Sequence, residues 1–224
     1  MFIFITRIPA ICAVFVVLWS SGFVMGKYSL DHSGAFTMLF WRYLLVVIVL
    51  ALLVTLFRQW QRIPLSNLTR HMAVGVMAHA VLLAAIFCAI DLGLSTGLAA
   101  FITALQPIMT GALSARITGE RVTGREWAGL TLGLIAVAIV IGDGIAFGGS
   151  LLAYALVLVA VISITVASLV DRSATVAGSI MSSAGGQQPG NTEPLLLITF
   201  WHCAAALLIF APLAIGIERL ESDW

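Results

Sequence analysis

The sequence predicts an all-α integral membrane protein, a polytopic bundle of about seven transmembrane helices. Of its 224 residues, 61% are apolar and only 9% are charged, and the mean hydropathy is +1.11. A soluble domain of this composition would aggregate, since ordinary domains carry about 25% charged residues. The net charge of +1 creates no field that attracts a polyanion, which excludes a nucleic-acid binder. The apolar runs lack the alternation of β-barrel strands, so helices are the expected spanning elements.

Charged and turn residues divide the chain into seven apolar runs, each of a length that crosses the hydrocarbon core. The first follows Arg7 and is too long for the apolar core of a signal peptide, so we expect the protein to retain it. The second carries one arginine, the third ends at Asp91, and the fourth contains Pro107. The fifth is uninterrupted, the sixth stops at Asp171, and the seventh follows Pro194. The predicted spans are about 8–29, 35–57, 73–90, 96–116, 127–142, 151–170 and 195–217.

Basic residues are distributed unevenly between the two predicted sides of the bundle. One side carries Arg7, Arg58, Arg62, Arg70, Arg116, Arg121, Arg125 and Arg172, and the opposite side carries Lys27 and Arg219. Because basic loops remain in the cytoplasm, we expect a cytoplasmic N-terminus, with residues 58–71 and 116–126 inside and residues 30–34 and 143–150 outside. The polar, Gly/Ser-rich stretch 173–194 is predicted to be a flexible cytoplasmic linker between two halves.

A short sequence similarity between two of the runs supports the division into two halves. Leu39–Arg42 reads LFWR in the second run, and Thr199–His202 reads TFWH in the seventh. These two spans cross the membrane in opposite directions, which is the pattern of an inverted five-helix repeat. The sequence therefore predicts a first repeat over residues 1–145 and an incomplete second repeat of two helices over residues 146–224, out of an expected ten-helix architecture.

Arg42 is a candidate substrate-binding residue because charged groups are costly inside hydrocarbon. It lies about two turns inside the outer end of the second span. A guanidinium facing a central cavity would bind a carboxylate through paired donors. Alternatively, the side chain extends to the outer headgroups, as this depth permits.

His79 and Asp91 are candidate proton-coupling residues. His79 lies near the middle of the third span, where an imidazole can gain and lose a proton during a transport cycle. The alternative is a neutral histidine that is hydrogen-bonded between helices. Asp91 ends the same helix on the side of Arg42 and Lys27, so either it pairs with them or it is a solvated loop residue.

The fourth span contains Gln106 followed by Pro107, and the proline frees the carbonyl of Thr103 in mid-membrane. Freed backbone at that depth usually lines a polar cavity, although a simple packing kink is the alternative. We expect Thr103, Gln106 and Pro107 to line such a cavity. Small polar groups and an aromatic ring of the first span are expected to share it, namely Trp19, Ser20 and Ser21.

Glycine pairs four residues apart allow helices to approach closely. They occur at Gly22/Gly26, Gly93/Gly97 and Gly129/Gly133, and only the last lies on an uninterrupted span, so we single it out as a helix interface and a possible homodimer contact. The cysteines, Cys12, Cys88 and Cys203, lie within apolar runs and are interpreted as packing residues. No motif of a metal site, cofactor site or enzyme is recognised, so we expect no cofactor and no catalytic residue.

Several motifs together resemble the EamA-type half of the drug/metabolite transporter superfamily. They are WSSGF at Trp19–Phe23, FWR at Phe40–Arg42, AIDLG at Ala89–Gly93 and the long stretch Gly97–Ile141, with its proline-bearing helix, the basic hairpin Gly119-Glu120-Arg121 and a glycine-paired helix. The resemblance covers residues 8–142 well and residues 151–217 more loosely. It implies inner-membrane carriers with ten helices in two inverted halves that export amino acids, related metabolites or drugs, often in exchange for protons.

The chain departs from this pattern in two respects. It stops after two helices of the second half, and His202 stands where the first half has Arg42. We therefore expect a truncated member, and we expect Glu120 to serve the cytoplasmic hairpin rather than substrate contact. The predicted function is export of a small-molecule substrate by alternating access. A non-transporting remnant or membrane subunit remains an alternative, and an integral membrane enzyme is a remote one.

Overall fold

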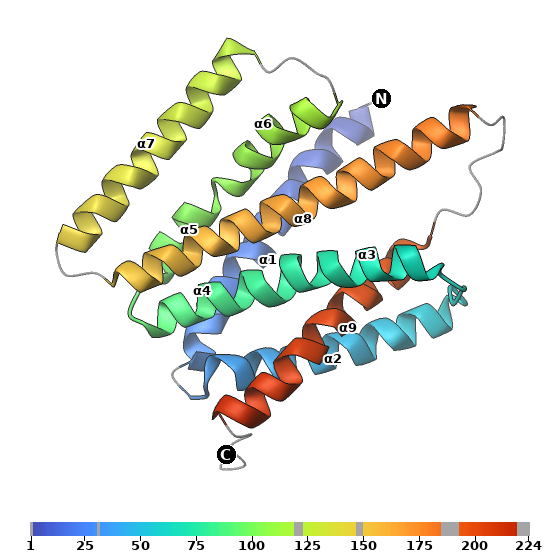
Figure 1. Ribbon diagram of the computed structural model, residues 1–224, viewed down its shortest axis with the longest axis horizontal. Helices are drawn as coiled ribbons and strands as arrows, with labels where there is room; N and C mark the ends of the chain where they lie inside the picture. The colour runs from blue at the N-terminus through green and yellow to red at the C-terminus, as the bar shows by residue number, and fades with distance from the viewer. Residues whose placement is uncertain (1, 31, 119–122, 147–149, 185–192, 219–224) are drawn as a thin grey trace.

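The computed structural model describes residues 2–30, 32–118, 123–146, 150–184 and 193–218 (Figure 1). These residues form helices and connecting turns, and no strand occurs among them. Seven helical segments in this part of the chain are long and apolar enough to cross a membrane: Cys12–Leu30, Ala35–Leu56, Leu65–Asp91, Thr96–Leu113, Trp127–Gly144, Leu151–Ser173 and Leu195–Gly216. The prediction of an all-α protein with seven spanning helices is confirmed.

Three of the seven spans are not simple α-helices. The first, second, fifth and sixth are single helices, α1 (Phe2–Leu30), α2 (Ala35–Leu56), α7 (Gly124–Ala146) and α8 (Leu151–Ala184). The third consists of α3 (Leu65–Gly75), the π-helical segment η1 (Val76–Val81) and α4 (Leu82–Asp91). The fourth breaks into α5 (Thr96–Thr103) and α6 (Gln106–Thr118), and the seventh is α9 (Leu195–Leu213) followed by the π-helical η2 (Ala214–Glu218).

Helices α3 and α8 extend farthest beyond the predicted limits of their spans. Helix α3 starts at Leu65, directly after Pro64, whereas the apolar run was expected to begin at residue 73. Helix α8 continues to Ala184, so residues 173–184 of the expected flexible linker are helical; residues 185–192 lie outside the described part. Hydropathy marks where a chain becomes apolar, while a helix persists through polar residues until a breaker stops it. The sequence has no proline between Asp171 and Ala184, so no proline ends α8 where the apolar run ends.

Successive spans run in opposite directions, so their connections alternate between two ends of the bundle (Figure 1). Helix α2 packs against α9, α4 against α8, and η1 against both α8 and α9. Helix α7 packs against α6 at the edge of the bundle. Large side chains that are almost completely buried come from α2, α4, α5, α8 and α9, among them Leu39, Phe87, Ile90, Ile102, Val157, Leu197 and Phe210.

A tight turn brings α5 back alongside α4. Gly93 has a φ of +94°, a left-handed conformation that glycine adopts without steric cost. The N–H of Leu94 donates to the carbonyl of Ala89, 3.0 Å away, which closes the end of α4 in a Schellman arrangement. The Ser95 hydroxyl then accepts from the N–H of Leu98 and caps the start of α5. This connection sets the position of α5 relative to α1 and α8.

The glycine pairs contribute to packing differently from the expectation. A Cβ at Gly26 would overlap the ring of Phe87, so Gly26 permits the close contact of α1 with α4. A Cβ at Gly133 would lie 3.2 Å from the Leu105 side chain, whereas nothing lies within 4 Å of the one at Gly129. The tight contact at Gly133 is therefore internal to the chain, and a homodimer through this pair stays a prediction.

Of the cysteines, Cys203 is buried, whereas Cys12 is exposed, so the packing interpretation is wrong for Cys12.

Candidate functional site

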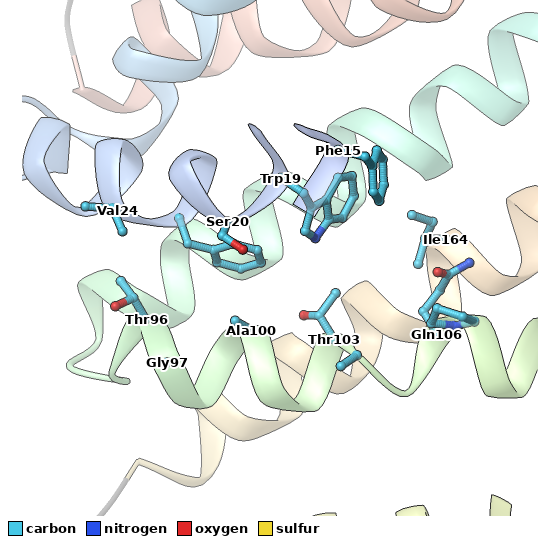
Figure 2. A pocket seen from close by; sticks show the side chains of 13 residues that line it. Phe15, Trp19, Ser20, Val24, Thr96, Gly97, Ala100, Thr103, Gln106 and Ile164 are labelled. Carbon is cyan, nitrogen blue, oxygen red and sulfur yellow. The ribbon is translucent and has the colours of Figure 1, made fainter. Parts of the chain in front are cut away.

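A cavity of about 530 Å³ opens between α1 and the broken helix formed by α5 and α6. Figure 2 shows Trp19 and Ser20 of α1 on one wall and Thr96 and Thr103 of α5 on the other. The side chains and backbone that line it are Phe15, Trp19, Ser20, Phe23, Val24, Thr96, Gly97, Ala100, Thr103, Ala104, Gln106, Pro107 and Ile164. Five residues predicted to share a cavity, Trp19, Ser20, Thr103, Gln106 and Pro107, thus come together; Ser21 is not among the lining residues.

The break between α5 and α6 follows from Pro107. A proline at this position has no N–H to donate to the carbonyl of Thr103, and its ring disfavours helix in the preceding turn. The chain tightens there, and the N–H of Leu105 donates to the carbonyl of Ile102, 3.2 Å away. Helical bonding resumes with the N–H of Met109 and the carbonyl of Leu105. The interruption exposes backbone and the neighbouring polar side chains to the cavity, where water or a solute can satisfy them.

The cavity combines an apolar and aromatic lining with a few polar groups, as ligand pockets usually do. The buried Thr103 hydroxyl donates to the carbonyl of Ala99 over 2.7 Å, which leaves the oxygen able to accept another hydrogen bond. The Gln106 amide donates to the Thr110 hydroxyl at 3.1 Å and to the Ser168 hydroxyl at 3.5 Å. The second contact ties α6 to α8 and holds the side chain in position.

Arg42 borders a different and smaller cavity, of about 60 Å³, between α1, α2 and α4. Trp19 and Phe23 line both this cavity and the one of about 530 Å³, whereas Arg42 lines only the smaller one. The Arg42 side chain is exposed in the protein alone. Both interpretations, substrate contact and extension to the headgroups, are compatible with this placement, so its role stays a prediction.

His79 and Asp91 lie apart from the large cavity and from each other. Twelve residues of helix separate them, which is about 18 Å at 1.5 Å per residue. Asp91 is exposed at the end of α4. His79 lies in η1, where the Ser163 hydroxyl of α8 donates to the carbonyl of Met77 over 2.7 Å. The His79 ring packs edge-on against the Tyr43 ring, with ring centroids 5.9 Å apart. The centroid of the His202 ring lies 6.1 Å from that of His79.

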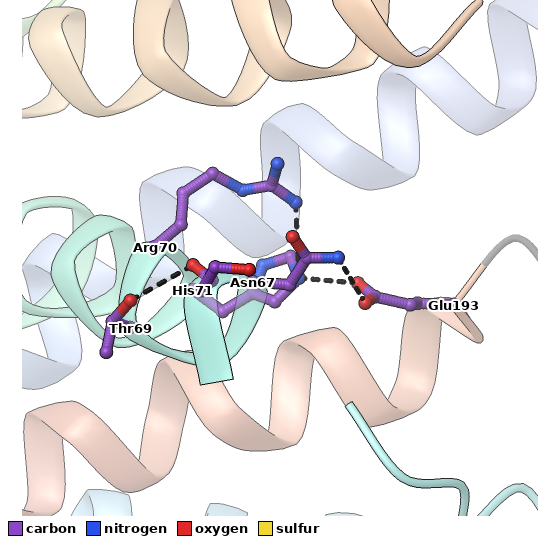
Figure 3. Close-up of polar contacts among 6 residues, drawn as sticks. Asn67, Thr69, Arg70, His71 and Glu193 are labelled. Carbon is purple, nitrogen blue, oxygen red and sulfur yellow. Dashed lines mark hydrogen bonds and ion pairs between the residues drawn. The ribbon is translucent and has the colours of Figure 1, made fainter. Parts of the chain in front are cut away.

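A polar cluster that the sequence did not predict joins the start of α3 to the start of α9 (Figure 3). Nε2 of the buried His71 donates to a carboxylate oxygen of Glu193 at 2.6 Å, and the Asn67 amide donates to the other oxygen at 3.0 Å. Arg70 lies beside them, with a guanidinium nitrogen 3.5 Å from Nε2 of His71. Partial burial raises the pKa of Glu193, but the hydrogen bonds from Asn67 and His71 and the charges of His71 and Arg70 lower it below its usual value.

The identity of the protein follows from comparison with known families. Residues 8–142, more than half of the chain, match the EamA-like transporter family. The chain belongs to this family. The matched region covers the first four spans and nearly all of the fifth, and it includes the parts of α1, α5 and α6 that line the cavity of about 530 Å³. This agrees with the resemblance carried by the Trp19–Phe23 and Gly97–Ile141 motifs.

Two curated proteins are similar to the chain in sequence. The chain is 32% identical over 145 residues to a protein of Salmonella typhimurium described as a probable amino-acid metabolite efflux pump, covering 62% of this chain and 46% of that protein. It is 30% identical over 130 residues to a protein of Escherichia coli K12 with the same description, covering 58% and 41%. The matches thus extend over less than half the length of these relatives. No solved structure matches the chain.

Part of the predicted EamA-type pattern lies outside the described residues. This holds for the Gly119-Glu120-Arg121 triplet, so the expected hairpin role of Glu120 stays a prediction. Within the described residues, no group of three or more His, Cys, Asp and Glu side chains has a geometry that would hold a metal ion.

Acidification is expected to weaken the contact between α3 and α9. Because the pKa of Glu193 is lower in the folded protein than in the unfolded chain, its carboxylate stabilises the fold above the usual glutamate pKa. This contribution is lost as the pH falls through the folded-state pKa. Glu193→Gln should unfold about 2–4 °C below the wild type near neutral pH, and at the same temperature as the wild type near pH 3. Thermal circular dichroism measures both values; a difference that stays constant with pH would contradict the assignment.

Proposed function

We propose that this EamA-like protein exports amino acids or related small metabolites, which bind in the cavity between α1 and the α5–α6 pair. The cavity carries the proposal, because its volume of about 530 Å³ accommodates a small metabolite and its polar groups gather at a broken helix. The description of the two relatives as probable amino-acid metabolite efflux pumps supports the same substrate class. Alternating access, with protons exchanged for substrate, is the mechanism we propose for the cycle.

The two-repeat organisation is part of this proposal. The family match over residues 8–142 supports a five-helix unit close to the predicted 1–145, and residues 146–224 contribute α8 and α9. Helices α2 and α9, which carry LFWR and TFWH, pack against each other and run in opposite directions (Figure 1). This arrangement is compatible with helices related by an inverted repeat.

We also propose that the protein lies in the inner membrane with its N-terminus in the cytoplasm. The connection 57–64 carries Arg58 and Arg62, and it lies at the same end of the bundle as the start of α9 (Figure 1). Basic connections at one end support a cytoplasmic location for that end. The Asn67–His71–Glu193 cluster then also faces the cytoplasm.

A pair of threonine substitutions tests the substrate site. Thr103 lines the cavity and Thr131 on α7 does not, yet both hydroxyls donate to the carbonyl four residues earlier, at 2.7 and 2.8 Å. Removing either hydroxyl therefore breaks the same kind of hydrogen bond to the preceding turn of its helix. Loss of one substrate hydrogen bond, worth about 1 kcal/mol, should raise the half-saturating substrate concentration for efflux about fivefold in Thr103→Val.

The measurement is efflux of labelled amino acids from cells that express each variant at equal membrane abundance. Thr131→Val should match the wild type. Equal half-saturation of Thr103→Val and Thr131→Val would place the substrate elsewhere. An absence of amino-acid efflux by the wild type would refute the proposed substrate class.

A further inference from the structure

Three histidine rings from separate segments lie in a row inside the bundle. His71 of α3 and His202 of α9 have ring centroids 5.6 Å apart, and His202 and His79 of η1 have centroids 6.1 Å apart. His79 lies near the middle of the third span, while Glu193, which accepts from His71, lies just before the seventh span begins. The row therefore connects mid-membrane depth to one end of the bundle.

Two ring nitrogens of this row have no hydrogen-bond partner among the described residues. Nδ1 of His71 and Nε2 of His202 are both buried and unpaired, and the His71 side chain is only 2% exposed. A buried polar nitrogen without a partner is costly, so such groups usually contact an ordered water or exchange a proton. When His71 is neutral and its Nε2 donates to the Glu193 carboxylate, Nδ1 carries no proton and can accept one.

Charged and titratable groups surround the row from each neighbouring helix. His202 is within electrostatic range of Arg70 on α3 and Asp171 on α8, besides the two other histidines. His79 is within range of Arg42 on α2 and packs against Tyr43. The carboxylates of Glu193 and Asp171 thus attract a proton, while Arg42 near His79 and Arg70 beside His71 repel one. The Glu193 carboxylate is the one hydrogen-bonded to a member of the row, so it is the acceptor for a proton that leaves His79.

We propose that His79, His202, His71 and Glu193 form a proton-release path from the middle of the membrane to the end of the bundle where α3 and α9 begin. The proposal rests on the proposed proton-exchanging exporter and names the route by which its proton leaves. Chains of Asp, Glu and His within transmembrane segments commonly act as such relays. Tight packing holds the route in place, because a Cβ at Gly75 would lie 2.5 Å from the Cα of His202.

The transfer balances without any other reactant. His79 as an imidazolium passes a proton to His202 through an intervening water. His202 then releases the proton on Nε2, through a second water, to Nδ1 of His71, while the proton on Nε2 of His71 moves to the Glu193 carboxylate. The products are a neutral His79, a neutral His202, a neutral His71 in its other tautomer and a neutral Glu193 carboxyl. Glu193 finally releases the proton to bulk water and becomes a carboxylate again.

Hydrogen exchange of the His79 ring tests the path without requiring transport. The full chain is labelled with 15N-histidine and placed in lipid nanodiscs, and the exchange rate of the His79 ring N–H with water is measured by NMR. His202→Phe removes the middle member of the row, and Glu193→Gln removes the terminal acceptor outside the membrane span. Each should slow the His79 exchange by roughly tenfold or more. His32→Phe, which changes an exposed ring outside the row, should leave the rate unchanged.

Two outcomes distinguish a failure of this proton path from a failure of the proposed function. Unchanged His79 exchange in Glu193→Gln and in folded His202→Phe would overturn the path, even if the wild type exports its substrate in exchange for protons. Slowed exchange in both variants would support the path, even if no amino-acid efflux were found. Because Glu193→Gln alters a residue outside the spans, it decides the question if His202→Phe fails to fold.

Discussion

Replacing Gly75 by alanine should destabilise the protein by about 3 kcal/mol, although alanine is the better helix former. Gly75 is the last residue of α3 and has ordinary helical dihedral angles, φ −60° and ψ −45°, so alanine causes no backbone strain there. The added Cβ would instead lie 2.5 Å from the Cα and 2.6 Å from the carbonyl oxygen of His202. These are backbone atoms, so α9 as a whole must move away from α3.

Gly129→Ala is the matched control, because a Cβ at Gly129 meets nothing within 4 Å. The same substitution should there stabilise α7 by about 0.5–1 kcal/mol. Unfolding of both variants in one detergent, followed by circular dichroism, measures the two changes in the free energy of unfolding. Equal changes of the same sign would show that α3 and α9 are not in close contact at Gly75.

Hydropathy predicted the number of spans because each apolar run is as long as the hydrocarbon core is thick. It did not predict where α3 and α8 begin and end, since polar helical turns such as Ser66–His71 continue a helix without being apolar. The π-helical turn at His79 was also missed. It depends on tertiary contacts, including the hydrogen bond from Ser163 to the Met77 carbonyl, which no local pattern encodes.

The large cavity could be predicted from the sequence because a proline breaks a helix through a purely local effect. Pro107 breaks its helix wherever the rest of the chain lies, and the polar neighbours Thr103 and Gln106 then mark the open side. The histidine row was not predictable in the same way. His71 is 122 residues away from Glu193 in the sequence and farther still from His202, and it was assigned to a cytoplasmic connection. The spacing of Asn67 and His71, four residues apart on one helical face, was the available local signal.

Filling the cavity at Gly97 should abolish efflux while the protein still folds. Gly97 lines the cavity opposite Trp19 and Ser20, and a Cβ placed on it meets nothing within 4 Å (Figure 2). A phenylalanine ring at this position therefore enters the cavity without displacing backbone. The ring would occupy the space that we assign to the substrate, so efflux at matched membrane abundance should fall by about tenfold or more.

Gly142→Phe on α7 provides the control for the size and hydrophobicity of the new side chain. A Cβ at Gly142 also meets nothing within 4 Å, and this residue does not line the cavity. Both variants should unfold within a few degrees of the wild type, because neither overpacks the interior. Gly142→Phe should retain wild-type efflux. If Gly97→Phe retains it as well, the solute does not pass between α1 and α5, and Gln106 then serves to join α6 to α8.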